Sequence, residues 1–579
     1  MFFTLGVSAA SPRLCAELAD RARVADPAVM PIPGPAVVVW RSPDGRAALL
    51  RWGGPPGPGE PASAGEQASA GDHASAGMKA MSQAGTIWPE SPTPGSGRAA
   101  VVARTSVTRV DPVYLAQVPG AVIVADRAIW AAWTASRLDA HDPLHVAALL
   151  NPGFPLGSAT PFSGVSALTP CTTLHLLNGA LTRLRTPVGA EAPGPVPGGA
   201  ERGDDGLRGD GGLAGARAVA EGLVAAVAQL ADVGQPVELS LTGGKDSRLI
   251  AAALVAAGVP VVARTHGFAD HPDVVVAAEI ARRLGIEHLV KTPAAPGQQV
   301  DVLGRIRATV LVADGMLSAF ENVGRPDPAA SSVVTAGGHG GELLRGGYAE
   351  TAAGRPGTAG GLRAALGPAR RAARAAELLR RLTSKHLGLI RTGPAAGYVA
   401  SLAPWSAALA RSPLHALDDF YLVNRAGRWS AAARQAYLIR ETLVQPLFDD
   451  RVVLAARAVP LADRISGALS AAVLAELCPA LVGVPLAGKP PKAAAGQGQA
   501  PFDWRRQYGE AIGALLRDYT LDLGAGAGLF AVVNRSAAER ILTAPHSDHA
   551  TVWALATLAC LLSGDYRHAR DPAQLVSVS

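Results

Sequence analysis

Residues 237–254 read VELSLTGGKDSRLIAAAL, and this stretch decides how the rest of the chain is interpreted. The apolar run VELSL predicts a buried strand, and the Ala- and Leu-rich run that follows Ser247 predicts a helix. Between them, Gly243 and Gly244 let the backbone approach a ligand closely and adopt φ values that other residues avoid. The N–H groups of the turn and of the helix N-terminus then converge on one point, which favours an anion such as phosphate.

Asp246 fits beside a phosphate only when a divalent cation joins the two, as the hard cation Mg²⁺ does. Ser247 could donate to a phosphate oxygen or act as the helix N-cap. A plain capped turn is the alternative, because Asp and Ser both favour the first positions of a helix. The Walker pattern GxxxxGK[ST] is absent, since Lys245 stands between Gly244 and Asp246.

On both sides of this stretch the chain alternates between helical and extended patterns. Helical AVAEGLVAAVAQLADV precedes it, and PVVARTHG (strand), PDVVVAAEIARRLG (helix) and EHLVKT (strand) follow it. Such alternation indicates a parallel, doubly wound sheet. Past residue 350 the pattern is almost wholly helical, and LRAALGPARRAARAAELLRRLTSKH is strongly basic. This basic stretch is either a solvated Arg-rich helix or a face for an acidic substrate or partner.

The N-terminal third has a different character. Residues 1–50 carry short apolar runs separated by turn residues, a pattern typical of strands and hairpins. Residues 53–98 are rich in Pro, Gly, Ala and Ser and repeat ASAG, which predicts a low-complexity, disordered insertion. A second breaker-rich stretch, residues 187–215, predicts a linker. We therefore expect one domain over residues 1–205 and another over residues 206–579.

Bulk properties limit the class of protein. A length of 579 residues favours two domains or more, and a net charge of +6 does not by itself indicate nucleic-acid binding. The first residues lack the pattern of a signal peptide, and the apolar runs are too short to cross a bilayer, so we expect a cytoplasmic protein. Neither a disulfide framework nor a zinc site is indicated by the four scattered cysteines, Cys15, Cys171, Cys478 and Cys560.

The turn sequence SLTGGKDS resembles the SGGxDS pyrophosphate loop of ATP pyrophosphatases, in particular that of the asparagine synthetase superfamily. The resemblance continues in order over about residues 237–460. THGFADHPDVVVAAEIARRLGIEH resembles the second strand and helix of that family. VVTAGGHGGELLRGGY resembles the second ATP-site loop, approximately SGEGxDExxGGY, and aligns with it without a gap. LVQPLFDDRVVLAARAVP resembles the segment VPFLDxRxVxxAxxLP.

The resemblance implies an α/β protein with two parts. The N-terminal part would be an α+β sandwich like that of Ntn hydrolases. The C-terminal part would be an adenine-nucleotide α-hydrolase-like, doubly wound parallel sheet with extra helices. ATP and Mg²⁺ are the implied cofactors, and Asp246 and Glu342 align with the two metal-binding aspartates of the family. The implied nucleotide-binding positions are Ser240, Thr242, Gly243, Gly244, Asp246, Ser247, Thr265, His266, Gly337 and Gly338.

Three further residues are candidates for catalysis. His339 stands where asparagine synthetases have a glutamate and β-lactam-forming relatives have a tyrosine. A histidine could take a proton from an attacking amine, or it could only order the loop or contact the substrate. The family also uses a late lysine to stabilise charge that develops during amide formation. Either Lys489 or Lys492, in LAGKPPKAAAG, is expected to have that role.

The glutaminase chemistry of the family is not expected here. Glutamine-dependent asparagine synthetases begin Met-Cys and use that cysteine as nucleophile, whereas this chain begins Met1-Phe2-Phe3. Cys15 is too far along the chain to replace it. The N-terminal domain is therefore expected to be an inactive glutaminase-like domain, and the amine is expected to come from another source.

Among relatives, the chain resembles the lasso peptide cyclases, which are macrolactam synthetases. The features in common are DSR after the glycines, the GHGGE loop and the helical, basic C-terminal half. The implied reaction is adenylation of a side-chain carboxylate of a core peptide and attack by its N-terminal amine. Residues 360–440 and 314–316 would line the peptide pocket. A leader peptidase and a leader-binding protein are the further implied partners, with no nucleic acid and no membrane.

Other functions remain open. A β-lactam synthetase-like cyclisation of a small molecule and an ammonia-dependent asparagine synthetase are alternatives within the superfamily. A tRNA-modifying enzyme would need a nucleic-acid-binding extension and often a reactive cysteine, and neither is evident in the sequence. A non-catalytic scaffold fits poorly with the retention of both metal carboxylates, Asp246 and Glu342.

Overall fold

The chain forms two compact units, one of residues 1–142 and 157–188 and one of residues 143–156 and 189–579. The boundary expected at residue 205 falls outside the residues that the structure describes, as does the predicted linker up to residue 209. The last residues of that predicted linker, 210–215, instead belong to a helix that begins at Asp210. The computed structural model describes residues 3–23, 37–52, 86–90, 100–185, 210–292, 299–324, 333–353, 368–487, 503, 505–506, 508–544, 548–569 and 575–577.

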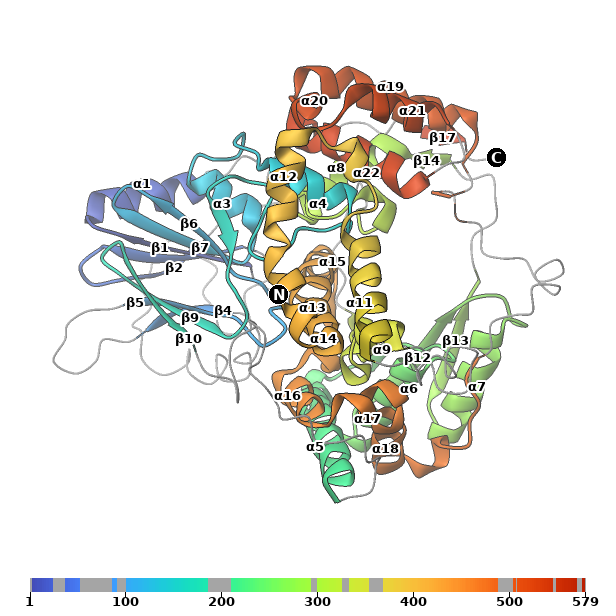
Figure 1. Cartoon of the computed structure of the whole chain (residues 1–579). Coiled ribbons are helices and arrows are strands. Elements are labelled where there is room, and N and C mark those ends of the chain that lie inside the picture. The colour runs from blue at the N-terminus through green and yellow to red at the C-terminus, as the bar shows by residue number, and fades with distance from the viewer. Residues whose placement is uncertain are drawn as a thin grey trace. The chain divides into compact units, whose positions relative to one another are not determined.

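The first unit is a sandwich of two antiparallel sheets with helices on one side (Figure 1). The six-stranded sheet has the order β2-β3-β1-β7-β6-β8, and the four-stranded sheet has the order β10-β9-β5-β4. Apolar side chains of both sheets, among them Leu49, Val101 and Leu174, form one core between them. The elements are β1 (Phe3–Ala9), α1 (Pro12–Arg23), β2 (Val37–Arg41), β3 (Ala47–Trp52), β4 (Thr86–Glu90), β5 (Ala100–Arg104), β6 (Tyr114–Val118), β7 (Ala121–Ala125), α3 (Ala128–Thr134), β8 (Val165–Ala167), β9 (Thr172–Leu177) and β10 (Ala180–Arg185).

Strand β4 corrects one expectation. Residues 53–98 were predicted to be a disordered insertion, yet Thr86–Glu90 pairs antiparallel with β5. Ile87 is buried in the core, and Thr, Ile and Trp favour strands, so this short segment has enough apolar surface to join the sheet. The rest of the insertion, residues 53–85 and 91–98, lies outside the described residues.

Cys15 cannot serve as a nucleophile in this unit. It lies on α1 and is completely buried, and burial raises the pKa of its thiol to about 11. Because the thiolate is the reactive form, a buried thiol of raised pKa is inert. This agrees with the expectation that Cys15 does not replace an N-terminal cysteine.

The second unit is built on the parallel sheet expected from the alternating pattern, and its order is β13-β12-β11-β15-β16 (Figure 1). The chain runs from β11 through α6, β12 and α7 to β13, and then returns as β15 on the other side of β11. Apolar residues of α5, α6, α16 and α18 share one core with these strands. The elements are α5 (Asp210–Val227), η2 (Ala228–Val233), β11 (Val237–Ser240), α6 (Lys245–Ala256), β12 (Val261–His266), α7 (Pro272–Leu284), β13 (Glu287–Lys291), β15 (Val334–Gly337), η4 (Gly341–Arg345), β16 (Thr442–Val444), η7 (Pro446–Phe448), α16 (Asp450–Ala458), α17 (Leu461–Ser466) and α18 (Ala468–Leu477).

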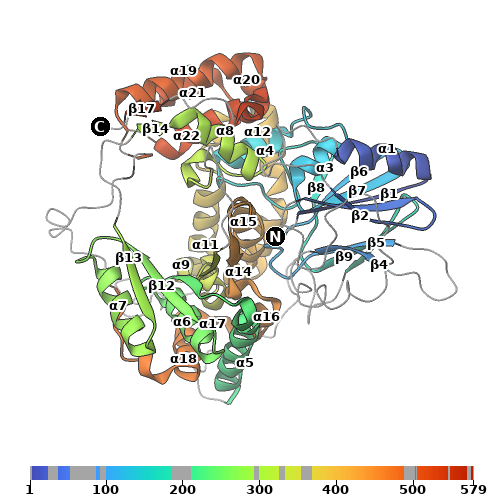
Figure 2. The same ribbon diagram turned by 180° about the vertical axis from the view of Figure 1, so that it is seen from behind.

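The remainder of the second unit is mainly helical, as expected past residue 350, although β16 and the short strand β17 are exceptions. Figure 2 shows α8, α19, α21 and α22 gathered in one bundle, and these helices pack on one another. The elements are α4 (Pro143–Leu150), β14 (Gln299–Asp301), α8 (Val302–Val312), η3 (Ala319–Glu321), α9 (Tyr348–Ala353), α11 (Pro368–Thr383), η5 (Leu387–Leu389), α12 (Thr392–Ser401), α13 (Ala403–Arg411), α14 (Pro413–Phe420), η6 (Tyr421–Ser430), α15 (Ala431–Leu438), η8 (Pro479–Leu481), α19 (Glu510–Gly526), α20 (Leu529–Val532), α21 (Arg535–Thr543), α22 (His549–Ser563), η10 (Asp565–His568) and β17 (Leu575–Ser577).

One described helical stretch, residues 214–233, is long and apolar enough to cross a bilayer. Its apolar side packs against α16 and α18 in the core of the second unit, as the side of a core helix does. The basic helix α11 carries Glu377, whose carboxylate pairs with both Arg380 and Arg381 on the exposed face.

A buried ion-pair network joins the helices next to the sheet. The Asp418 carboxylate on α14 accepts hydrogen bonds from Arg464 on α17, at 2.8 Å, and from Arg457 on α16, at 3.0 Å. Arg464 also donates to the carbonyl of Leu343 in η4 at 2.5 Å. The Asp418 and Arg464 side chains are 2% and 3% exposed, so neither charge has water to replace a lost partner.

We therefore expect Asp418→Ala to lower the free energy of unfolding by about 3 kcal/mol or more, because it leaves the Arg464 charge buried and unpaired. Urea unfolding measures this change. Glu539→Ala removes one partner of the exposed pair Arg535–Glu539 and should change the free energy by less than about 0.5 kcal/mol. Equal effects of the two substitutions would contradict the structural role of the network.

Candidate active site

The site lies where strands β11 and β15 end side by side. Ser240, the last residue of β11, is in register with Gly337, the last residue of β15, and with Arg264 of β12. The chain leaves β11 toward β12 on one side, while β15 enters on the other side. In open parallel sheets this reversal opens a crevice at the carboxyl ends of the strands, where ligands bind.

The first loop, between β11 and α6, is held by its own hydrogen bonds. The Ser247 hydroxyl donates to the Thr242 carbonyl and accepts from the Thr242 N–H, each at 3.1 Å. Gly243 donates its N–H to Asp273 at 3.0 Å and accepts from Ala487 N–H at 3.1 Å. A Cβ on Gly243 would lie 2.4 Å from the Ala487 Cβ, so close packing by itself already requires glycine at this position.

Arg248, which the sequence analysis did not assign, organises the carbonyl side of this loop. Its buried guanidinium donates to the carbonyls of Gly243, Gly244, Val484 and Pro485 at 2.8–3.1 Å. Burial lowers the pKa of Arg248. The loop carbonyls are thereby satisfied within the protein. Gly244, the N-cap residue of α6, has no side chain and donates its N–H to the Thr242 hydroxyl at 3.2 Å; the N-terminal end of such a helix attracts an anion.

The second loop, between β15 and η4, packs directly on the first. A Cβ on Gly341 would lie 2.0–2.3 Å from the carboxylate atoms of Asp246, and one on Gly338 would lie 2.7 Å from the Ser247 nitrogen. Gly340 has φ = +99°, a conformation that side chains disfavour. The glycine-rich sequence is therefore needed to let one loop's backbone touch the other loop's carboxylate.

Arg345, also missed from the sequence, gathers the carboxylates of both loops. It forms a short ion pair with Asp246 and lies 3.2 Å from Glu350 and 3.8 Å from Glu342. Burial raises the pKa of Asp246, and the charge of Glu342 adds to this shift while Arg345 opposes it. The Tyr421 hydroxyl donates to Glu342 at 3.1 Å. The structure thus brings together Asp246 and Glu342, the two predicted metal carboxylates.

These two carboxylates fit Mg²⁺, which binds oxygen ligands and often uses one or two carboxylates together with phosphate oxygens and water. A cation bound there would oppose the burial that raises the pKa of Asp246 and would favour its charged form. Within the described residues, no group of three His, Cys, Asp or Glu side chains is placed to hold a metal. A magnesium ion at this position would therefore need phosphate oxygens and water to complete its ligands.

His339 lies on the second loop, three residues before Glu342. The residue is exposed in the structure, yet desolvation by the protein around it lowers its pKa below the ordinary value of 6.5. The charges of Glu342 and Asp246 oppose this shift, and that of Arg425 adds to it. In the described part of the chain no hydrogen bond or ion pair engages the imidazole. A neutral imidazole in this state can accept a proton.

Two tyrosines complete this side of the site. The rings of Tyr348 and Tyr421 meet edge to face with centroids 5.1 Å apart. Burial raises the pKa of both hydroxyls, so they remain protonated donors. Tyr421 belongs to η6, within the helices 360–440 that were expected to line a pocket.

Residues 314–316 were expected to line the peptide pocket, and one of them contacts the helix η6 that carries Tyr421. Met316 is buried, and its sulfur accepts from Arg428 of η6 at 3.8 Å. The Gly315 carbonyl lies 2.9 Å from Nε2 of the buried His145. These contacts are internal packing, and the role of the segment in a peptide pocket stays a prediction.

The expected nucleotide contacts Ser240, Thr265 and His266 divide into two kinds. The buried Thr265 hydroxyl donates to the Leu241 carbonyl and lies 2.8 Å from His288 Nε2, so it is engaged within the protein. The side chains of Ser240 and His266 are exposed at the carboxyl edge, where a nucleotide could reach them. Burial and the nearby Lys291 lower the pKa of His266.

The two candidate lysines, Lys489 and Lys492, lie outside the described residues. In sequence, Lys489 follows Ala487 by two positions, and Ala487 donates to the first loop. Which lysine acts in catalysis stays a prediction.

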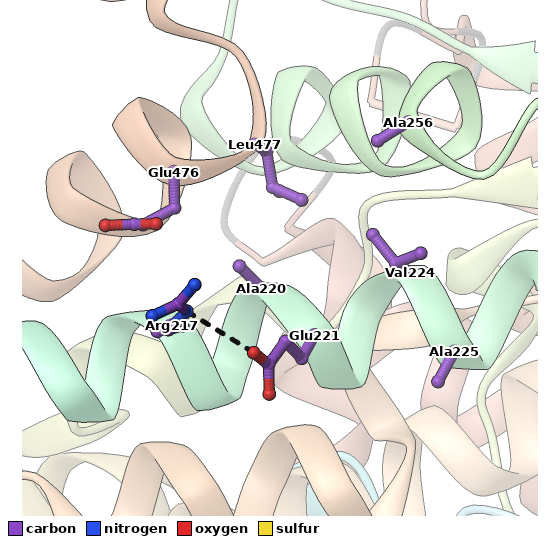
Figure 3. Close-up of a pocket in the computed structure, with 8 residues that line it drawn as sticks. All are labelled: Arg217, Ala220, Glu221, Val224, Ala225, Ala256, Glu476 and Leu477. Carbon is purple, nitrogen blue, oxygen red and sulfur yellow. Dashed lines mark ion pairs between the residues drawn. The ribbon is translucent and has the colours of Figure 1, made fainter.

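A separate hollow of about 420 Å³ lies between α5, the end of α6 and α18 (Figure 3). Its charged residues Arg217 and Glu221 pair with each other at 3.5 Å. It contains no residue of the two loops. The hollow is lined by Arg217, Ala220, Glu221, Val224, Ala225, Ala256, Glu476 and Leu477.

The contact between the loops can be tested with Gly341→Ala. The added Cβ would overlap the Asp246 carboxylate, so the carboxylate must move and the affinity for Mg·ATP should fall roughly ten-fold or more. Titration with a nucleotide and circular dichroism measure binding and folding separately. Gly393→Ala, where a Cβ would meet nothing within 4 Å, should leave the affinity unchanged. Normal affinity in Gly341→Ala would show that the Asp246 position does not matter.

Comparison with known proteins identifies the family. No curated protein matches the chain. The family model described as asparagine synthase matches residues 218–563, more than half of the chain. This span contains both loops, His339 and η6. The chain therefore belongs to the asparagine synthase family, whose members are ATP-dependent ligases that form carbon–nitrogen bonds.

Proposed function

We propose that this ligase closes a macrolactam ring in a peptide, as the lasso peptide cyclases do. The observation that carries the proposal is the second loop. It keeps a carboxylate, Glu342, next to Asp246, but it has His339 where an asparagine synthetase has glutamate. The imidazole is neutral and unengaged by the described residues, as a group that handles the proton of an amine needs to be.

The first step is carboxylate activation. A side-chain carboxylate oxygen of an Asp or Glu in the core peptide attacks the α-phosphorus of ATP. The bond from the α-phosphorus to the bridging oxygen breaks, and pyrophosphate leaves. The N-terminal end of α6, with the backbone at Ser247, binds the phosphates, while the Ser247 hydroxyl holds the loop. Magnesium, which Asp246 and Glu342 would hold, supplies positive charge that offsets the charge of the phosphates.

The second step is ring closure. The N-terminal amine of the same peptide attacks the activated carbonyl carbon, the amide bond forms, and AMP leaves with the former carboxylate oxygen. His339 accepts the proton that the amine loses. Because the amine and the carbonyl belong to one molecule, holding the peptide folded removes much of the entropic barrier. Lys489 or Lys492 stabilises the negative charge that develops.

The partners follow from the reaction. A core peptide without its leader is the proposed substrate, and a leader peptidase and a leader-binding protein of the same pathway would supply it. No nucleic acid and no membrane take part in the proposed chemistry.

Asp246→Ala should abolish adenylation and ring closure, because the phosphates lose their metal-linked carboxylate. The measurement is isotope exchange between ATP and pyrophosphate, together with mass spectrometry of the peptide, which loses one water on cyclisation. Asp518→Ala changes an exposed carboxylate and should leave both activities unchanged. Turnover of Asp246→Ala at the wild-type rate would overturn the assignment.

His339→Ala should retain pyrophosphate exchange but lose ring closure by roughly 100-fold or more. The pKa of His339 lies below 6.5, so the base is present at pH 7; its protonation as the pH falls through that lowered pKa should add an acidic limb to the one set by the substrate amine. His339→Ala should lose this acidic limb. If ring closure and its pH profile persist in His339→Ala, the residue only positions the substrate. Product from aspartate and ammonia, but from no peptide, would instead favour ammonia-dependent amidation.

A further inference from the structure

The long helical segment that carries Tyr421 has a π-helix in its middle. Helices α14 and α15 are joined by η6, a π-helix of ten residues, Tyr421–Ser430, with helical backbone at both junctions. π-Helical segments are rare and occur frequently at functional sites. Tyr421, Arg425 and Trp429 recur every four residues along it, so they share one face of the helix.

Arg425 is held on this face by aromatic rings. Its guanidinium carbon lies 3.5 Å from the centroid of the Trp429 ring and 5.9 Å from that of Phe154. Arginine stacks well on aromatic faces, and stacking leaves its N–H groups free to bind in the plane of the guanidinium. Within the described part of the chain, no carboxylate pairs with Arg425.

Within the described residues, nearby arginines, unlike Arg425, are paired with carboxylates. Arg345 contacts three carboxylates, Arg457 contacts Asp418 and Asp419, and Arg464 contacts Asp418. Trp429 adds a second unsatisfied donor, because its indole Nε1 is buried and has no acceptor among the described residues. A buried donor without an acceptor is costly, and a ligand oxygen could satisfy it.

The position of Arg425 is close to the reacting groups. Its charge contributes to the pKa of His339, Tyr348 and Tyr421, and so acts on the same site. Tyr421, four residues earlier on the same helix face, donates to Glu342. A cation at this place repels a protonated amine and favours the neutral, nucleophilic form. The amine of the substrate is therefore not the group that Arg425 binds.

We propose that Arg425, stacked on Trp429, forms a subsite that binds a carboxylate of the substrate and positions it beside His339. The inference rests on the proposed function and deepens it, because it assigns recognition of the acid to a residue outside both loops. Guanidinium and carboxylate match as two parallel N–H···O bonds. The phosphates have their own site at α6 and the carboxylate pair Asp246 and Glu342.

Phenylglyoxal labelling of the full-length protein tests the subsite directly, with mass spectrometry reporting each arginine. The probe is N-acetylglutamate α-amide, which carries only a side-chain carboxylate, and the neutral control is N-acetylglutamine α-amide. The glutamate probe should slow labelling of Arg425 roughly ten-fold, and the glutamine probe should not. The exposed Arg371 is the internal control and should react equally in all samples.

A non-hydrolysable ATP analogue with Mg²⁺ distinguishes carboxylate from phosphate recognition. Protection of Arg425 by the nucleotide alone would overturn the proposal and make Arg425 a phosphate contact. Absence of protection by the glutamate probe would also overturn it. This readout needs no turnover, so it stands even if no peptide is cyclised and the proposed function fails.

Variants supply a second readout. In pyrophosphate exchange with a peptide substrate, Arg425→Met should raise the KM for the peptide roughly 10- to 100-fold and leave the KM for ATP unchanged. Arg425→Lys should recover part of this loss, because it restores the charge without the paired geometry. An increase in the KM for ATP, or no change in the KM for the peptide, would contradict a carboxylate subsite.

Discussion

The site depends on one close contact, the packing of the Asp246 carboxylate against the backbone of Gly341. Two loops that are almost a hundred residues apart in sequence can meet in this way only because β11 and β15 are neighbours in the sheet. The contact leaves no room for a side chain at Gly341, and Gly338 is similarly close to Ser247. Close packing of the two loops therefore requires glycine at these positions, whether or not a ligand is bound.

Charged side chains hold the two loops in this arrangement. Arg248 donates hydrogen bonds to the carbonyls of the first loop. Arg345 forms ion pairs with Asp246 of the first loop, with Glu342 of the second loop and with Glu350 of α9. Behind them, Arg464 links the carbonyl of Leu343 to Asp418 on α14. Helix α14 continues into η6, so the same network connects the second loop to the helix that presents Tyr421 and Arg425.

Local patterns were sufficient to predict the centre of the second unit. The strand, glycine turn and helix around Asp246 and the neighbouring β12 and α7 have short-range signals in the sequence. The placement of Glu342 beside Asp246 was implied only by the resemblance to the asparagine synthetase superfamily. The roles of Arg248 and Arg345 could not be derived in this way, because their partners lie in segments far away in the sequence. In the sequence, Arg248 drew attention only as part of the DSR triplet that resembles the lasso peptide cyclases.

Other features of the structure were not predicted from the sequence, and each has a physical reason. A π-helix has no distinctive residue pattern, since apolar residues recur in η6 much as they do in an α-helix. Strand β4 lies within a compositionally biased stretch, and its burial against β5 becomes apparent only in the folded unit. The Thr265 hydroxyl is engaged by Leu241 and His288, so a nucleotide contact at Thr265 would come from its backbone and stays a prediction. The sequence places Lys489 and Lys492 only in a Gly/Pro-rich loop.

The most direct test of the account is whether both loops bind one metal–nucleotide complex. Electron paramagnetic resonance of Mn²⁺, used in place of Mg²⁺, reports free metal in solution. With a non-hydrolysable ATP analogue present, the wild-type protein should bind Mn²⁺ more tightly than Glu342→Gln does, by roughly ten-fold or more. Equal Mn²⁺ affinity of Glu342→Gln and the wild-type protein would contradict a site shared by Asp246 and Glu342.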